Sequence, residues 1–114
     1  MTHSPRKVLI VEDDRLIAFM MADMVQSMGC LVVGPYHVLQ DGLDHARRGE
    51  VDFALLDYDL GDGTDSLPIA ETLNTRGIPF AFATGTDPSI LREITNQPIL
   101  SKPVVERELA TLIH

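Results

Sequence analysis

The stretch DFALLDYDLGDG, residues 52–63, decides the expected fold of this chain of 114 residues. Its apolar run from Phe53 to Leu56 has the length of a strand buried on both faces, and the run ends directly in Asp57. Two more acids follow at Asp59 and Asp62. Carboxylates crowded at the end of a buried strand repel one another unless a proton, a cation or distance relieves the repulsion. The rest of the chain decides which of these applies.

On both sides of this stretch, short apolar runs alternate with helical patterns. Further strands are predicted at 8–11, 31–33, 79–83 and 99–100, and helices at 16–28, 38–48, 66–76, 88–96 and 104–113. The strand at 31–33 is expected to end at Gly34-Pro35, and Tyr36 and His37 are expected to be loop residues without a chemical role. This alternation predicts one α/β domain, residues 1–114, with a doubly wound parallel sheet covered by helices on both faces.

The composition restricts the function classes. Hydrophobic residues make up 45% of the chain, charged residues 23%, and the formal net charge is −8. An acidic chain is unsuited to the phosphates of DNA or to an anionic membrane surface, but it suits a cation site or a basic partner. No apolar run approaches the roughly 20 residues of a membrane span, and the N-terminus does not read as a signal peptide. The single Cys30 cannot form an internal disulfide. We therefore expect a cytoplasmic protein.

Polar side chains follow four of the five predicted strands. Glu12 and Asp13 follow the first, Asp57 the third, Thr84 the fourth and Lys102 the fifth. Because the carboxyl ends of parallel strands meet at one edge of the sheet, where such folds bind ligands, these groups are expected to converge there. The three carboxylates need a counter-charge, and Mg²⁺ suits oxygen ligands of this kind. No Cys/His spacing suited to zinc is present.

The lysine and the hydroxyl extend this prediction to a phosphoryl group. Lys102 is a point cation for an arriving phosphate, and the Thr84 hydroxyl can donate to a phosphoryl oxygen. Phosphoryl transfer depends mainly on positioning and charge stabilisation, which a metal ion, a lysine and a hydroxyl supply together. Asp57, in their midst, is the natural acceptor.

Four short strings carry a resemblance to a known family. They are VLIVEDD (8–14), ALLDYDL (54–60), FATG (82–85) and SKP (101–103). In this order and spacing they resemble the four signatures of response-regulator receiver domains, over essentially the whole chain. The resemblance implies a flavodoxin-like fold with strand order 2-1-3-4-5. It also implies a bacterial two-component protein that is not an enzyme but a phosphoacceptor with slow self-dephosphorylation. The phosphoryl group would come from a sensor histidine kinase or a phosphotransfer protein.

The resemblance also implies roles for the matching positions. Asp57 is the phosphoacceptor, Asp13 a direct Mg²⁺ ligand, and Glu12 acts mainly through water. The backbone carbonyl of Asp59 completes the metal ligands, with Asp57 itself among them. The next position, Asp14, is expected to begin a helix, where an acid suits the helix dipole.

In the same family, Thr84 and Lys102 bind the phosphoryl oxygens, and the peptide bond before Pro103 is commonly cis. No effector region follows the last predicted helix, so the expected output is a contact with an unknown protein. That contact is expected on the helices at 88–96 and 104–113, which also offer a face for a homodimer.

Three positions depart from the family pattern. Receivers usually carry Tyr or Phe three residues before the lysine, where this chain has Ile99, so the usual coupling of the threonine hydroxyl to an aromatic rotamer cannot operate. Gly61 stands where many receivers have Pro. The FATG string resembles a subset of single-domain receivers, but the loop continues with Thr86 and Asp87 in place of the motif of that subset. The side chains of Asp59 and Thr86 are expected to flank the phosphoryl group.

Two other functions remain open at this point. The string LLDYDLGDGT echoes the first motif of haloacid-dehalogenase phosphatases, but Gly61 stands where that motif has Thr and the chain is short for that fold. A receiver-like binding module that is never phosphorylated is the second alternative. The complete set of acids, threonine and lysine argues against it, while Ile99 argues mildly for it.

Overall fold

The structure is a computed structural model, and it describes residues 5–113. Its elements in chain order are β1 Lys7–Val11, α1 Arg15–Ser27, β2 Leu31–Tyr36, α2 Leu39–Arg48, β3 Phe53–Asp57, β4 Asp59–Gly61, β5 Thr64–Asp65, α3 Leu67–Thr75, β6 Phe80–Thr84, α4 Pro88–Arg92, β7 Ile99–Ser101 and α5 Glu106–Ala110. Within these described residues, none of the helices combines the length and apolar character needed to cross a bilayer.

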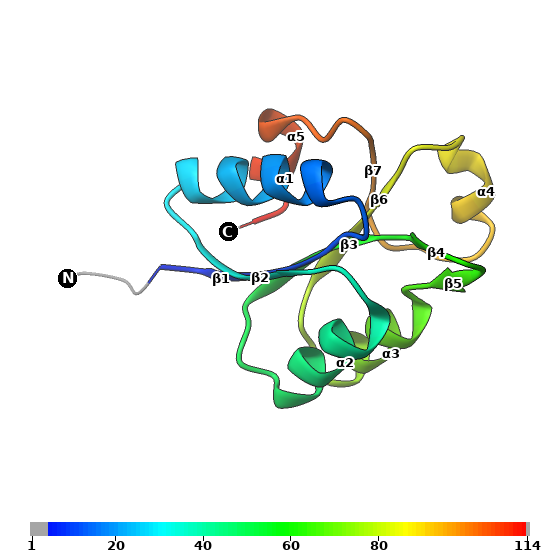
Figure 1. Cartoon of the computed structure of the whole chain (residues 1–114), viewed down its shortest axis with the longest axis horizontal. Coiled ribbons are helices and arrows are strands. Elements are labelled where there is room, and N and C mark those ends of the chain that lie inside the picture. The colour runs from blue at the N-terminus through cyan, green and yellow to red at the C-terminus, as the bar shows by residue number, and fades with distance from the viewer. Residues whose placement is uncertain (1–4, 114) are drawn as a thin grey trace.

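The main sheet has five parallel strands in the order β2-β1-β3-β6-β7. The strands β4 and β5 form a separate antiparallel pair, so β6 and β7 are the fourth and fifth strands of the main sheet, and the order is the predicted 2-1-3-4-5. Figure 1 shows α1 and α5 on one face of the sheet and α2 and α3 on the other. α4 packs beside β7, and its Leu91 belongs to the apolar cluster on the side of α2 and α3. The predicted doubly wound α/β fold is confirmed.

The strands are buried because helices cover both faces of the sheet. Along β1, Val8 and Ile10 belong to the apolar cluster under α1 and α5, whereas Leu9 and Val11 belong to the cluster under α2 and α3. The two central strands, β3 and β6, are buried at every position. Burial of apolar surface is the dominant favourable contribution to folding, so these two clusters are the main source of stability.

A glycine sets the distance between α2 and the sheet. A Cβ atom at Gly42 would lie 2.7 Å from a methyl carbon of Val11 and 2.8 Å from the terminal carbon of Ile69. A larger residue would push α2 away from both β1 and α3. Gly42 is therefore needed for the close packing of this layer.

The second strand is longer than predicted. β2 continues through Gly34 and Pro35 to Tyr36, so the predictions that the strand ends at Gly34-Pro35 and that Tyr36 is a loop residue are wrong. Proline cannot donate a ladder hydrogen bond, but β2 is an edge strand, where that donor is not needed. The peptide bonds before Pro35 and Pro103 are both cis, the second as the family resemblance implies.

The last two helices are shorter than predicted. α4 stops at Arg92 and not near residue 96, because the Ile94 and Thr95 N–H groups both donate to the Leu91 carbonyl in a closing turn that leads back to β7. α5 begins at Glu106 and not at 104, because Val105 is extended and buried Val104 packs into the core. In both places the connection to β7 overrides the helical pattern of the sequence.

Candidate functional site

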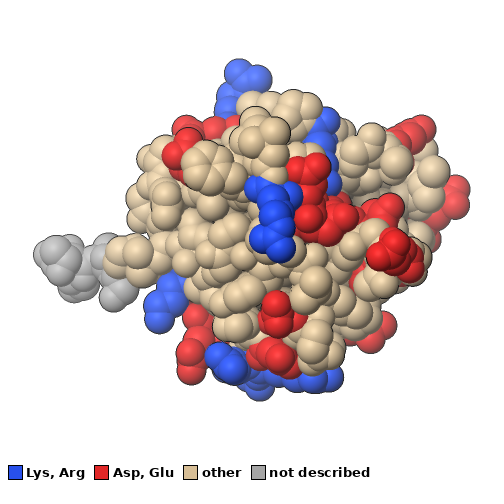
Figure 2. Space-filling view, viewed as in Figure 1, with Lys and Arg blue, Asp and Glu red and all other residues tan. Residues whose placement is uncertain are grey.

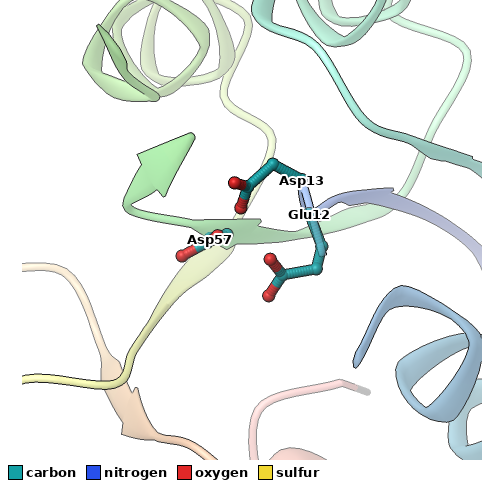
Figure 3. A group of neighbouring side chains, drawn as sticks. All are labelled: Glu12, Asp13 and Asp57. Carbon is teal, nitrogen blue, oxygen red and sulfur yellow. The ribbon is translucent and has the colours of Figure 1, made fainter. Parts of the chain in front are cut away.

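The acids that follow β1 and β3 meet at the carboxyl edge of the sheet. Val11 pairs with Leu56 in neighbouring parallel strands, so Glu12 and Asp57, one residue further on, lie side by side. One carboxylate oxygen from each of Glu12, Asp13 and Asp57 lies within 4.8 Å of the others. Figure 3 shows the three carboxylates facing a common space at the end of β3. They line an open cleft of about 670 Å³, and the structure thus brings together the three acids that the sequence places there.

Lys102 enters the same cluster from the end of β7. Its Nζ lies 2.6 Å from Oε1 of Glu12 and 3.0 Å from Oδ1 of Asp57. The Lys102 side chain is 15% exposed, while Glu12 is fully buried. One ammonium therefore faces two largely desolvated carboxylates, with the exposed Asp13 close by. The cluster holds more negative than positive charge when its acids are ionised, which favours the binding of a proton or a cation.

The pKa values show how the cluster shares its charge. Burial, together with neighbouring Glu12 and Asp13, raises the pKa of Asp57 to about 8. For Asp13, burial acts to raise the pKa, but hydrogen bonds with Asp57 and Glu12 outweigh it and the pKa is lowered. For Lys102, burial acts to lower the pKa, but Glu12 and Asp57 outweigh it and the pKa is raised. In the folded protein without a cation, Asp57 therefore binds a proton more tightly than an isolated aspartate does, and a metal ion would compete with that proton.

The hydroxyl at the end of β6 is turned toward its own loop. Thr84 is buried, and its Oγ1 lies 2.9 Å from Oγ1 of Thr86 and accepts a hydrogen bond from the Thr86 N–H at 3.1 Å. The Thr84 carbonyl accepts from the Lys102 N–H at 2.8 Å, which fixes the end of β6 beside Lys102. Thr84, Thr86 and Lys102 all line the same cleft as the acids.

The short hairpin β4–β5 borders the cleft on the other side of Asp57. Gly61, Asp62 and Gly63 have φ values of 89°, 52° and 74°, which makes the tight turn that the sequence predicts at these residues. A Cβ atom at Gly61 would lie 3.2 Å from Oδ2 of Asp13, so glycine lets the hairpin approach this acid closely. Asp59 is exposed, and its Oδ1 accepts from the Gly61 N–H at 2.9 Å.

Asp14 stands apart from the cluster of acids. Its Oδ1 accepts from the Ile17 N–H at 3.0 Å and caps the N-terminus of α1, as predicted. The N–H of Asp14 donates in turn to Oε2 of Glu12 at 3.1 Å, which fixes that carboxylate from the side opposite Lys102.

The donor set fits a hard divalent cation. Mg²⁺ binds oxygen ligands at about 2.1 Å, so two oxygens that both bind it lie at most about 4.2 Å apart. The Glu12, Asp13 and Asp57 oxygens lie within 4.8 Å of one another, which fits an ion held directly by two of them and through water by the third. Burial and the neighbouring acids Glu12 and Asp13 raise the pKa of Asp57, and a cation bound between these carboxylates would oppose that rise. Figure 2 shows acidic side chains gathered toward the end of the molecule that carries β4, β5 and α4.

Comparison with solved structures identifies the family. The solution structure of SdrG from Sphingomonas melonis Fr1 is 36% identical, with a TM-score of 0.83 over 97% of this chain and 95% of that one. The BeF3-activated conformation of SdrG, from Pseudomonas melonis Fr1, is also 36% identical, with a TM-score of 0.78 over 98% and 100% of the two chains. The REC domain of the PhyR response regulator from Erythrobacter litoralis is 25% identical, with a TM-score of 0.80 over 96% and 88%. The chain belongs to the response-regulator receiver domains.

As a member of this family, the chain is a receiver domain of two-component signalling. No family model and no curated protein matches its sequence, so the likeness rests on solved structures. This family membership replaces the alternative of a haloacid-dehalogenase phosphatase. The fold also explains why Asp57, Thr84 and Lys102, at the carboxyl ends of their strands, line one cleft.

One residue near the cluster was missed from the sequence. Nδ1 of His37 lies 2.9 Å from the carbonyl oxygen of Glu12. His37 directly follows β2, whose carboxyl end lies at the same edge of the sheet as the acids. A residue that directly follows a strand is a candidate for this edge, but the incorrect prediction that the strand ends at Gly34-Pro35 placed His37 two residues too far from the strand end.

Proposed function

We propose that this receiver domain accepts a phosphoryl group on Asp57 in the presence of Mg²⁺ and signals through a protein contact. The observation that carries the proposal is the position of the Asp57 carboxylate, which is 3% exposed and lies between Glu12, Asp13 and the ammonium of Lys102. Such a carboxylate would have Mg²⁺ on the side of Glu12 and Asp13 and the ammonium of Lys102 on the other. Such an arrangement stabilises the charge of a transferring phosphoryl group.

In the proposed reaction, an oxygen of Asp57 forms a bond to phosphorus while the bond from phosphorus to the donor's imidazole nitrogen breaks, and the imidazole leaves. Mg²⁺, when bound, neutralises charge on the phosphoryl oxygens. Asp13, Asp57 and the Asp59 carbonyl would hold it, and Glu12 would act mainly through water. Lys102 then pairs with a phosphoryl oxygen in place of the Asp57 oxygen that it contacts at 3.0 Å. Thr84 turns its hydroxyl from Thr86 toward another phosphoryl oxygen.

The proposed donor is a histidine kinase or phosphotransfer protein that docks on α1. Leu16, Phe19 and Met20 on this helix are 68%, 69% and 52% exposed. An apolar groove of about 290 Å³ lies between α1 and the segment after β7, and it shares Ile17 and Lys102 with the acidic cleft. An apolar surface beside the acceptor suits a helical partner that presents a phosphohistidine.

The proposed output surface is the α4 region, with Ile90 and Ile94 61% and 52% exposed. The homodimer predicted on α4 and α5 stays a prediction. Size-exclusion chromatography with and without a phosphate analogue tests it, and the phosphorylated form is expected to elute earlier.

Intact-mass measurement tests the proposed function directly. The protein is incubated with Mg²⁺ and acetyl phosphate, and one added phosphate is expected on the wild type but not on Asp57→Asn. Chelation of Mg²⁺ is expected to abolish the addition. An unchanged wild-type mass under conditions where calorimetry detects bound Mg²⁺ would instead favour the receiver-like module that is never phosphorylated.

A Phe19→Ser variant tests the docking surface separately. We expect transfer from a phosphorylated histidine phosphotransfer protein to slow by about tenfold, because a largely exposed aromatic ring is a typical interface anchor. Phosphorylation by acetyl phosphate, which needs no docking surface, is expected to be unchanged. Ile90→Ser, on α4, is the matched control, and equal slowing by both variants would contradict docking on α1.

A further inference from the structure

The end of β2 holds the main chain of Glu12 at both polar groups. The Glu12 N–H donates to the carbonyl of Tyr36 at 2.9 Å, and Nδ1 of His37 lies 2.9 Å from the Glu12 carbonyl oxygen. A carbonyl oxygen can only accept, so Nδ1 of His37 carries a proton and donates it. Glu12 lies one residue beyond β1, so its carbonyl depends on the His37 side chain for this bond.

An irregularity in β2 brings His37 to this place. Between Val33 and Tyr36, three residue steps of β2 match only two steps of β1. Gly34 lies in this bulge with a φ of 104°, and a Cβ atom there would lie 2.7 Å from the Tyr36 nitrogen and 3.1 Å from the Ile10 carbonyl oxygen. The bulge moves Tyr36 and His37 by one position relative to β1. Without it, a different residue would face the Glu12 carbonyl.

Helix α2 supports the residue before His37. The Tyr36 ring stacks on the His45 ring with centroids 4.3 Å apart, and the Tyr36 hydroxyl lies 2.9 Å from Nε2 of His45. Nδ1 of His45 lies 3.0 Å from the Asp41 carbonyl oxygen and therefore donates to it, which leaves Nε2 to accept from the tyrosine. A continuous set of contacts thus runs from α2 through Tyr36 to the main chain of Glu12.

We propose that His37 is a positioning residue for the metal site. Its Nδ1–H fixes the turn from Glu12 to Asp13, so that the Asp13 carboxylate faces Asp57. Asp13 is exposed, so the direction of its side chain depends on the main chain at this turn. The inference rests on the proposed function, because it gives His37 a role in holding Asp13 for Mg²⁺. Partners of this kind, which orient ligands without touching the ion, strongly affect metal affinity.

Two substitutions at one position separate the hydrogen bond from the packing. His37→Asn keeps a donor close to the place of Nδ1, and His37→Leu has a similar size but no donor. Isothermal titration with Mg²⁺ is expected to show about tenfold weaker binding for His37→Leu and binding within about threefold of wild type for His37→Asn. Gln40→Leu, an exposed change on α2, is the control and is expected to bind like the wild type. Equal affinity of His37→Leu and wild type would overturn the proposal, as would equal loss in both His37 variants.

A measurement without metal distinguishes this inference from the proposed function. In chelator, NMR is expected to show faster hydrogen exchange at the Glu12 and Asp14 amides in His37→Leu, and rates close to wild type in His37→Asn. The nitrogen-15 shifts of the wild-type ring are expected to show the proton on Nδ1. A wild type that binds no Mg²⁺ would contradict the proposed function, and unchanged exchange rates in His37→Leu would overturn the positioning role itself.

Discussion

The two sides of the cleft are held in different ways. We define the acidic wall as Glu12, Asp13 and Asp57 (Figure 3). Glu12 is bound to Tyr36, His37 and Lys102, and Asp57 to Lys102, which come from separate parts of the fold. The hydroxyl loop, residues 84–87, is tied to the sheet by the Thr84 carbonyl. Beyond that point, its side-chain hydrogen bonds run only to residues two positions away.

This difference separates a fixed half of the site from an adjustable half. Bonds to distant elements break only when those elements separate, whereas bonds within a loop can exchange at small cost. We therefore expect the acidic wall to be formed before a metal ion arrives, and the hydroxyl loop to be the part that changes when Asp57 is phosphorylated. If Asp57 is phosphorylated as proposed, exchange of Thr84 between Thr86 and the phosphoryl group would supply that change, because Ile99 is aliphatic.

The largest expected effect comes from Lys102→Met, which tests whether the acidic wall depends on its ammonium. Methionine keeps much of the side-chain length but leaves Glu12 and Asp57 without their shared cation, so the free energy of unfolding at pH 8 in chelator should fall by about 3 kcal/mol. Urea denaturation measures this. Lys7→Met, at an exposed position, is the control, and a loss below about 1 kcal/mol for Lys102→Met would contradict a wall held by charge.

The second effect is a pH dependence of stability without metal. The folded-state pKa of Asp57 is about 8 and its ordinary value is 3.8, so the folded state binds more protons than the unfolded state between these values. Stability should therefore fall as the pH rises from about 4 to about 8. Urea denaturation in chelator measures this fall, which Asp57→Asn should largely remove and Mg²⁺ should reverse near pH 8. A fall of equal size in Asp57→Asn would assign it to other groups.

Thr86→Ala tests the adjustable half. The variant removes the hydroxyl that contacts Thr84, so phosphorylation by acetyl phosphate should become about threefold faster while Mg²⁺ affinity stays the same. Timed intact-mass measurement gives the rate, and Thr86→Ser, which keeps the hydroxyl, is the control. A change in Mg²⁺ affinity with no change in rate would show that the two halves are not separate.

The smallest expected effect is that of Asp59→Asn. Asp59 is exposed beside the cleft, and removing its charge should change the lifetime of the phosphorylated protein by about two- to threefold, through its effect on an attacking water. Loss of the phosphorylated mass over time measures the lifetime. Equal lifetimes in the two proteins would show that the Asp59 side chain does not influence dephosphorylation.

Much of the fold and of the site follows from local patterns in the sequence. The apolar runs that become β1, β3 and β6 are buried by helices on both faces, so their composition alone identifies them. Asp14 caps α1 as its sequence position predicts, and Asp87, just before the predicted helix at 88–96, caps α4. By contrast, the bulge at Gly34 and the early end of α4 depend on the pairing of β2 with β1 and on the return of the chain to β7.

The sequence by itself determined which groups stand at the ends of the strands, because burial of a parallel strand fixes where its apolar run stops and its polar residues begin. Only the tertiary structure decided how these groups share charge and contacts. The pKa of Asp57 depends on burial and on Glu12 and Asp13, and Glu12 contacts His37 through its carbonyl and Lys102 through its carboxylate. These interactions join residues far apart in the chain, and their strength depends on distance and desolvation, which only the folded arrangement sets.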